Sequence, residues 1–77
     1  MKIRYTKHAL EMLKLRKIEK SSVENCLKNP DIKIPGKSIA KIYLKRLGNK
    51  YLKVVAVKNK EIIIITCHWL ATSRIKE

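Results

Sequence analysis

The sequence predicts an α+β domain in which two N-terminal helices pack on a three- to four-stranded antiparallel sheet. Helix caps and helically spaced apolar residues occur before Pro30, whereas alternating and β-branched segments occur after it. Helices segregated from strands in this way are typical of α+β folds with antiparallel sheets. A chain of 77 residues buries only about 60–65% of its unfolded surface, enough for one small core. We therefore expect a single domain over residues 1–77.

Two helices are predicted in the first half of the chain, joined by a short turn near residues 17–20. Thr6 can cap the first helix, because its hydroxyl can accept from a free backbone N–H of the first turn. That helix carries apolar residues at helical spacing, namely Ala9, Leu10 and Leu13. Ser21 and Glu24 have capping-box spacing, which predicts the start of the second helix. Pro30 predicts its end at Asn29.

The second half predicts strands separated by turns. The predicted strands are 41–45, 51–57 and 61–69, and residues 31–34 can add a short fourth strand. The predicted turns are Pro35-Gly36, Gly48-Asn49 and residues 58–60. Tight turns between successive strands predict an antiparallel meander.

Alternation of side chains along a strand predicts which residues face the helices. The helix-facing set is Ile42, Leu44, Leu52, Val54, Ala56, Ile63, Ile65, Cys67 and Trp69. The open face then carries Lys41, Tyr43, Lys45, Tyr51, Lys53, Val55, Ile62, Ile64, Thr66 and His68. Such a face is basic and more apolar than solvent alone would favour, which predicts binding of an acidic protein.

The chain is strongly basic, with 19 Lys+Arg against 6 Asp+Glu, a net charge of +13 and a pI near 10.1. Residues 32–60 contain nine lysines and arginines and no acidic residue. This pattern predicts binding to a polyanion such as RNA. The candidate RNA contacts in this segment are Lys37, Lys41, Lys45 and Lys53. The alternative is that these lysines only keep strand edges and turns from pairing with other chains.

Several classes of protein are disfavoured by the sequence. The longest apolar run, residues 62–65, is too short to cross a bilayer, and the N-terminus does not resemble a signal peptide. Cys26 and Cys67 are too few for a disulfide framework and lack the spacing of metal ligands. We expect a cytoplasmic protein that uses no metal and no cofactor and does not bind membranes.

The candidate chemistry depends on His8 and His68, which stand among many cations. One imidazole can take the proton of a ribose 2′-OH while another protonates the leaving 5′-oxygen, and cations stabilise the charge on phosphorus. This combination suits metal-independent RNA cleavage. Arg16, eight residues after His8, can share its helix face, and Arg46 is a second candidate phosphate stabiliser. The alternative is that both histidines are packing residues.

The C-terminal segment offers two further candidates, Ser73 and Arg74, whose hydroxyl and guanidinium could contact phosphate. A polar tail without function is the alternative.

Four segments together resemble an uncharacterised family of small domains that is grouped with the RelE-like and BrnT-like toxin superfamily. They are Tyr5-Thr6-Lys7-His8-Ala9-Leu10-Glu11 with Arg16 and Ile18, residues 23–30, Pro35-Gly36-Lys37, and Ile65-Thr66 through Arg74. The resemblance implies a RelE-like fold, with N-terminal helices before a curved antiparallel sheet. It also implies an RNA-cleaving toxin neutralised by a partner antitoxin. By position, it assigns functional roles to His8, Arg16, Ser73 and Arg74.

The sequence departs from the family pattern at Met12, where an arginine is expected, and at Lys17, where a glycine is expected. Two functions therefore remain open. The first is a metal-independent endoribonuclease toxin that uses His8, Arg16, Arg46 and His68 as catalytic residues. The alternative is a catalytically silent module of the same fold that binds RNA, the ribosome or a protein. The expected partners are RNA, including ribosome-associated mRNA, and an acidic antitoxin-like protein.

Overall fold

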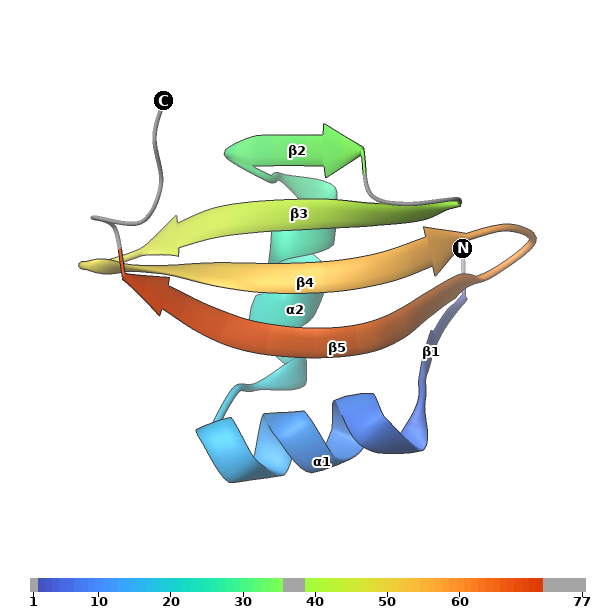
Figure 1. Ribbon diagram of the computed structural model, residues 1–77, viewed down its shortest axis with the longest axis horizontal. Coiled ribbons are helices and arrows are strands. Elements are labelled where there is room, and N and C mark those ends of the chain that lie inside the picture. Colours follow the sequence, from blue (N-terminus) through green and yellow to red (C-terminus); the bar gives the residue numbers. More distant parts are fainter. Residues whose placement is uncertain (1, 36–38, 72–77) are drawn as a thin grey trace.

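The computed structural model describes residues 2–35 and 39–71 and contains two helices and a five-stranded mixed sheet (Figure 1). Along the chain the elements are β1 (Ile3–Tyr5), α1 (Lys7–Arg16), α2 (Lys20–Lys28), β2 (Ile32–Pro35), β3 (Ala40–Leu47), β4 (Lys50–Lys58) and β5 (Ile62–Ala71). The strand order across the sheet is β1-β5-β4-β3-β2. Strands β2 to β5 form an antiparallel meander, and β1 pairs with β5 in parallel.

The predicted fold class was wrong in its sheet. A RelE-like arrangement of two leading helices on a three- to four-stranded antiparallel sheet is replaced by five strands, of which β1 precedes both helices. Three residues are too few to display the alternation by which a strand is recognised. The partner of β1 also lies at the far end of the chain, where Ile3 stands opposite Ile62.

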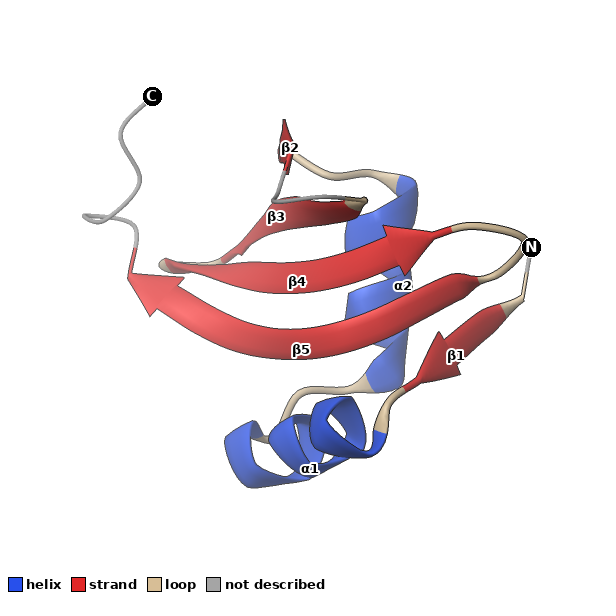
Figure 2. Cartoon of the chain, turned by 45° about the vertical axis from the view of Figure 1, so that its right-hand side comes forward, coloured by secondary structure: helices blue, strands red, loops and turns tan. Residues whose placement is uncertain are grey.

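Helix α1 lies along the same edge of β5 as β1, next to the part of β5 with which β1 does not pair. β1 pairs only with Ile62–Ile64, and Figure 2 shows α1 continuing along the same side of β5. Its N-cap was predicted correctly, because the Thr6 hydroxyl accepts from the Ala9 N–H at 3.0 Å. At its other end, Lys17 adopts a left-handed conformation with φ 54°.

Helix α2 lies behind the meander in Figure 1 and packs on β3 and β4. It begins at Lys20 with Glu19 as N-cap, so the predicted capping box was wrong. The Ser21 hydroxyl instead donates to the Glu19 carboxylate at 3.3 Å. The predicted end before Pro30 is confirmed, since Asn29 is the C-cap.

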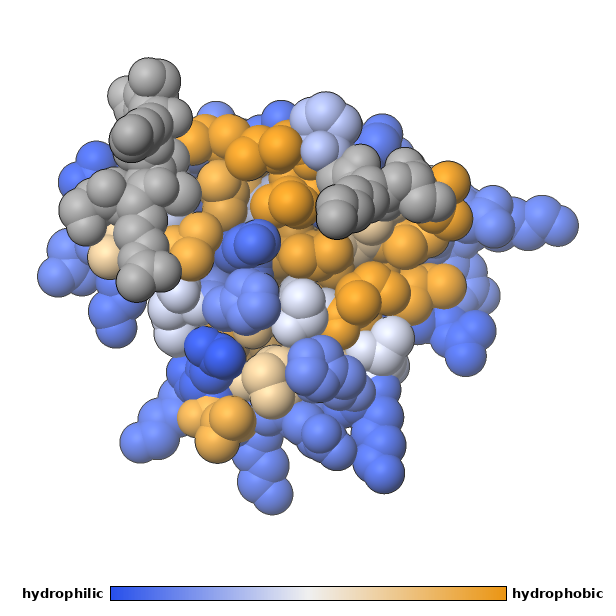
Figure 3. Space-filling view, in the orientation of Figure 1, coloured by the Kyte–Doolittle hydropathy of each residue, from blue (hydrophilic) through white to orange (hydrophobic). Residues whose placement is uncertain are grey.

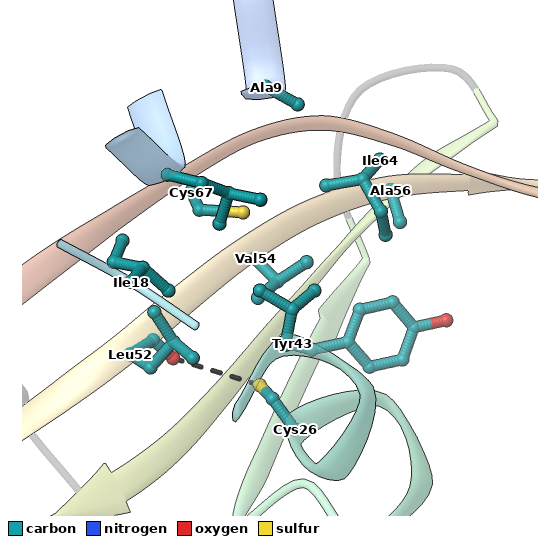
Figure 4. Close-up of a cluster of buried hydrophobic side chains, with 11 residues drawn as sticks. Ala9, Ile18, Cys26, Tyr43, Leu52, Val54, Ala56, Ile64 and Cys67 are labelled. Carbon is teal, nitrogen blue, oxygen red and sulfur yellow. Dashed lines mark hydrogen bonds between the residues drawn. The ribbon is translucent and has the colours of Figure 1, made fainter. Parts of the chain in front are cut away.

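The core lies between the helices and one face of the sheet (Figure 4). Its buried residues are Ala9, Leu13, Ile18, Val23, Cys26, Tyr43, Leu52, Val54, Ala56, Ile64 and Cys67. Burial raises the pKa of both thiols, to about 12 for Cys26 and about 11 for Cys67, so both are held as neutral packing groups.

The predicted faces of the sheet were correct for β4 and partly wrong elsewhere. In β3, Tyr43 is in the core, and Ile42 and Leu44 lie on the open face. In β5, a bulge places Thr66 opposite Val55 but Ile64 opposite Ala56. The extra residue, Ile65, reverses the alternation, so Ile64 is buried and Ile63 lies on the open face.

Neither helix in the described part of the chain is long and apolar enough to cross a membrane.

Candidate functional site

Both ends of α1 are tied to β5 by hydrogen bonds. At the start, the Thr6 N–H donates to the Ile64 carbonyl and the Thr6 hydroxyl donates to the Ile65 carbonyl, each at 3.1 Å. At the end, the Trp69 indole N–H donates to the Arg16 carbonyl at 3.1 Å. The helix therefore runs beside residues 64–69 in a fixed register.

One side of α1 presents His8, Met12 and Arg16, which are spaced four residues apart and so lie in one row. His8 and Arg16 are exposed, and Met12 is half-buried. The shared helix face that the sequence predicted for His8 and Arg16 is thus present, with Met12 between them.

His68 lies on the open face of β5, directly opposite Lys53 of β4. Partial burial lowers the pKa of His68, and the nearby Lys53, Arg16 and His8 lower it further. Helix α1, which carries His8 and Arg16, is hydrogen-bonded along the segment of β5 that carries His68, so the fold brings to one region two histidines that are sixty positions apart in the chain. We call His8, Arg16, Lys53 and His68 the histidine cluster.

The cluster combines one imidazole held neutral at physiological pH with a second imidazole and two cations. A neutral imidazole can accept a proton, and cations beside it can bind a phosphate. Within residues 2–35 and 39–71, no three His, Cys, Asp or Glu side chains are grouped so that they could hold a metal ion.

The other candidate residues are not part of the cluster. Arg46 shares the open face with His68 but lies two strands away, where its Nε donates to the Gly48 carbonyl at 3.1 Å. Lys41 and Lys45 lie on the opposite face, opposite the core residues Ala56 and Leu52. The Lys45 ammonium donates to the Asn29 carbonyl at 2.9 Å and so holds the end of α2. Lys37, Ser73 and Arg74 lie outside the described residues.

Sequence reasoning missed the residues that position this site. Thr6 was identified as a helix cap, but nothing in the sequence showed that it also bonds to β5. Trp69 was predicted to be core, and its ring does pack against the core, yet its indole N–H fixes the end of α1. The only signal in the sequence was the tryptophan itself near the end of a strand, because the indole N–H of a tryptophan usually finds a hydrogen-bond partner.

Thr66 is a further polar group near the cluster. It lies on the open face two residues before His68, and its hydroxyl is buried with no partner among the described residues. Leaving a buried hydroxyl without a hydrogen bond is unfavourable. Alternation placed Thr66 on the correct face, but it gave no sign of this unsatisfied group.

A comparison with family models matches residues 5–69 of the chain to "Domain of unknown function (DUF4258)". No curated protein and no solved structure matches the chain. The match agrees with the uncharacterised family expected from the sequence.

Proposed function

The chain belongs to the DUF4258 family, and we propose that this member is a small RNA-binding protein that cleaves RNA without a metal ion. One observation supports this proposal above the others. His8 and His68 are sixty positions apart in the chain, yet α1, which carries His8 and Arg16, is hydrogen-bonded along the segment of β5 that carries His68, and Lys53 stands opposite His68. A pair of imidazoles with adjacent cations is the arrangement that cleavage through the ribose 2′-oxygen needs.

In this mechanism neutral His68 takes the 2′-OH proton as the 2′-oxygen attacks the adjacent phosphorus. The bond between phosphorus and the 5′-oxygen breaks, and His8 gives its proton to that oxygen. The products are a 2′,3′-cyclic phosphate and a free 5′-hydroxyl. Arg16 and Lys53 stabilise the negative charge that builds up on the phosphate oxygens. Arg46, farther along the open face, is proposed to hold the neighbouring part of the RNA backbone.

The wider setting belongs to the same proposal. We place the chain with the RelE-like and BrnT-like toxins, as a cytoplasmic toxin that acts on RNA, including ribosome-associated mRNA, and is silenced by an acidic antitoxin-like protein. The net charge of +13 supports both an RNA and an acidic protein as partners.

A second function is supported by Met12. It occupies the centre of the row between His8 and Arg16, where a third cation would stand in the family pattern. An apolar side chain there cannot stabilise a phosphate. The alternative is therefore a module of the same shape that binds RNA or the ribosome without cleaving RNA.

The deciding experiment incubates the purified protein with end-labelled single-stranded RNA in the presence of a chelator. We expect cleavage that leaves a 2′,3′-cyclic phosphate, and a rate that falls about 10²–10⁴-fold in His8→Ala and in His68→Ala. Lys28→Ala, an exposed cation at the end of α2, is the matched control and should retain the wild-type rate.

Three other results would contradict the proposed mechanism or favour the alternative function. Full activity in the doubly substituted His8→Ala/His68→Ala protein would remove both residues from the mechanism. A strict requirement for Mg²⁺ would exclude the metal-independent mechanism. RNA binding without cleavage by the wild type would favour the silent module.

A further inference from the structure

The open face of the sheet carries an apolar area that extends from β2 to β5. One row of paired positions crosses four strands and consists of Ile34, Ile42, Val55 and Thr66. The next row contains Ala40, Val57 and Ile63. Ile34 is 40% exposed and Ile65, at the bulge, is 36% exposed. We call these residues the apolar sheet face.

Figure 3 views the molecule onto this side and shows hydrophobic residues gathered over the strands, with hydrophilic residues around them. Both helices pack on other parts of the sheet, α2 on the core side of β3 and β4 and α1 beside β5. A contiguous apolar surface of this kind on a small domain marks a binding site for another molecule.

The charges on and around this face are positive. Arg46 and Lys53 lie on the face itself, and Arg16 stands beside it on α1. Two acidic residues near the strand ends are already engaged. The Glu61 carboxylate pairs with Arg4 at 3.5 Å, and the Asp31 carboxylate accepts from the Arg46 backbone N–H at 2.7 Å. An occupant that complements this surface has an apolar centre and acidic flanks.

We propose that the apolar sheet face is the docking site for an acidic amphipathic helix of another protein. A sheet buries a free apolar face against a helix or a second sheet. A helix of about 18 residues is about 27 Å long, which suits a molecule measuring 33 × 26 × 19 Å. Its apolar stripe would cover Ile34, Val57 and Ile63, and its carboxylates would meet Arg46 and Lys53.

Two other occupants fit the surface less well. A second copy of the chain would bring two charges of +13 together, and this repulsion opposes a symmetric dimer. RNA complements the cations but not a row of isoleucine and valine side chains, which offer no aromatic ring for stacking and no hydrogen bond to a base.

This inference deepens the proposed function, on which it rests for the identity of the partner as the acidic silencing protein. The same helix would lie against Lys53 of the histidine cluster. It would therefore exclude RNA from the site without contacting the backbone of α1.

The test uses a synthetic peptide of about 18 residues, with leucine at helical spacing and glutamate and glutamine elsewhere. Calorimetric titration should show binding to the wild-type protein. Substitution Ile34→Ser with Ile65→Ser should weaken binding about tenfold or more, because two exposed apolar contacts are lost. The matched control is Leu10→Ser with Leu15→Ser, which removes two exposed leucines from α1, 43% and 71% exposed. That control should bind as the wild type does.

Charge and pattern are tested with two further peptides, one with lysine in place of glutamate and one with the same composition in scrambled order. Neither should bind. Equal binding of either peptide, or unchanged binding to the Ile34→Ser/Ile65→Ser protein, would overturn the proposal. A wild-type dimer in sedimentation that the same substitutions dissociate would assign the face to a second copy instead.

RNA binding is measured on the same proteins. Ile34→Ser/Ile65→Ser should retain it, since neither side chain is in the histidine cluster and the Ile65 backbone carbonyl that accepts from Thr6 is kept. A wild type that binds the peptide but not RNA would disprove the proposed function and leave the docking site standing. If the substituted protein does not fold, NMR shifts caused by the peptide on the wild type decide the question. Shifts confined to the helices would disprove docking on the sheet.

Discussion

The pKa of His68 depends on the groups around its imidazole. Its pKa is lowered below 6.5 by burial and by Lys53, Arg16 and His8. In Lys53→Gln, one of these cations is gone, so we expect the pKa of His68 to rise, as measured by NMR titration of its ring protons. Lys28, in the last turn of α2, is not among the groups that shift the His68 pKa, so Lys28→Gln should leave it unchanged. A His68 pKa at or above 6.5 in the wild type would contradict this description of the site.

The lowered pKa of His68 also makes the free energy of unfolding depend on pH. Well above pH 6.5 His68 is neutral in both the folded and the unfolded protein, so there it contributes no pH dependence. As pH falls from 6.5 towards the lower folded pKa, the unfolded chain takes up the proton first. The contribution of His68 to the free energy of unfolding therefore decreases over that interval.

At the scale of elements, α1 ends in a conformation that its sequence does not favour. Lys17 has φ 54°, while its N–H bonds back to the last turn and the Ile18 N–H donates to the Leu13 carbonyl at 2.8 Å. This is the position that glycine usually occupies. Lys17→Gly should raise the free energy of unfolding by about 1 kcal/mol and the melting temperature by about 4–8 °C.

The control for this prediction is Lys14→Gly, which places glycine inside the same helix. It should lower the free energy of unfolding by about 1 kcal/mol, because glycine is disfavoured in a helix interior. Urea unfolding of both proteins gives the comparison. A destabilised Lys17→Gly protein would show that the lysine side chain contributes more than the backbone strain costs.

Local signals in the sequence predicted local elements well. Thr6 gave the start of α1, Pro30 the end of α2, and Gly48-Asn49 the turn between β3 and β4, where Gly48 has the positive φ of 69° that such a turn requires. The row that contains His8 and Arg16 was also predictable from helical spacing.

The features set by tertiary contacts could not be read in this way. A single added residue at Ile65 exchanges the two faces of β5 over Ile62–Ile64, the part before the bulge, and no local residue type signals it. In β3 the side chain in the core is that of Tyr43, and the neighbouring Ile42 and Leu44 lie on the open face. Lys41 and Lys45 share the helix side with Tyr43, so their predicted place on the open face was wrong.

For the whole molecule, the distribution of charge predicts how RNA binding depends on salt. If the protein contacts about five phosphates, the slope of log affinity against log salt on single-stranded RNA should be near −3.5, about a hundredfold loss between 50 and 200 mM. Fluorescence anisotropy over that range measures it. A slope near zero would exclude RNA as a partner.

Two lysines of residues 32–60, the segment without acidic residues, provide matched variants for this measurement. Lys53→Gln removes a cation from the open face and should reduce the slope by about 0.7. Lys45→Gln removes a cation that bonds to the end of α2 on the other face, and it should leave the slope unchanged. Equal effects would show that RNA binding follows total charge rather than one surface.

The parallel pairing of β1 with β5 has a consequence for the order in which the protein acquires its site during synthesis. Thr6 and Ile65, which bond to each other, are 59 positions apart, and closing a loop of that length costs about 3–4 kcal/mol of chain entropy. The hairpins of β3, β4 and β5 close over much shorter distances and need no such loop. His8 therefore leaves the ribosome before β5, on a helix that cannot dock until β5 has been made. A nascent chain on the ribosome, surrounded by RNA, does not yet hold the two histidines together.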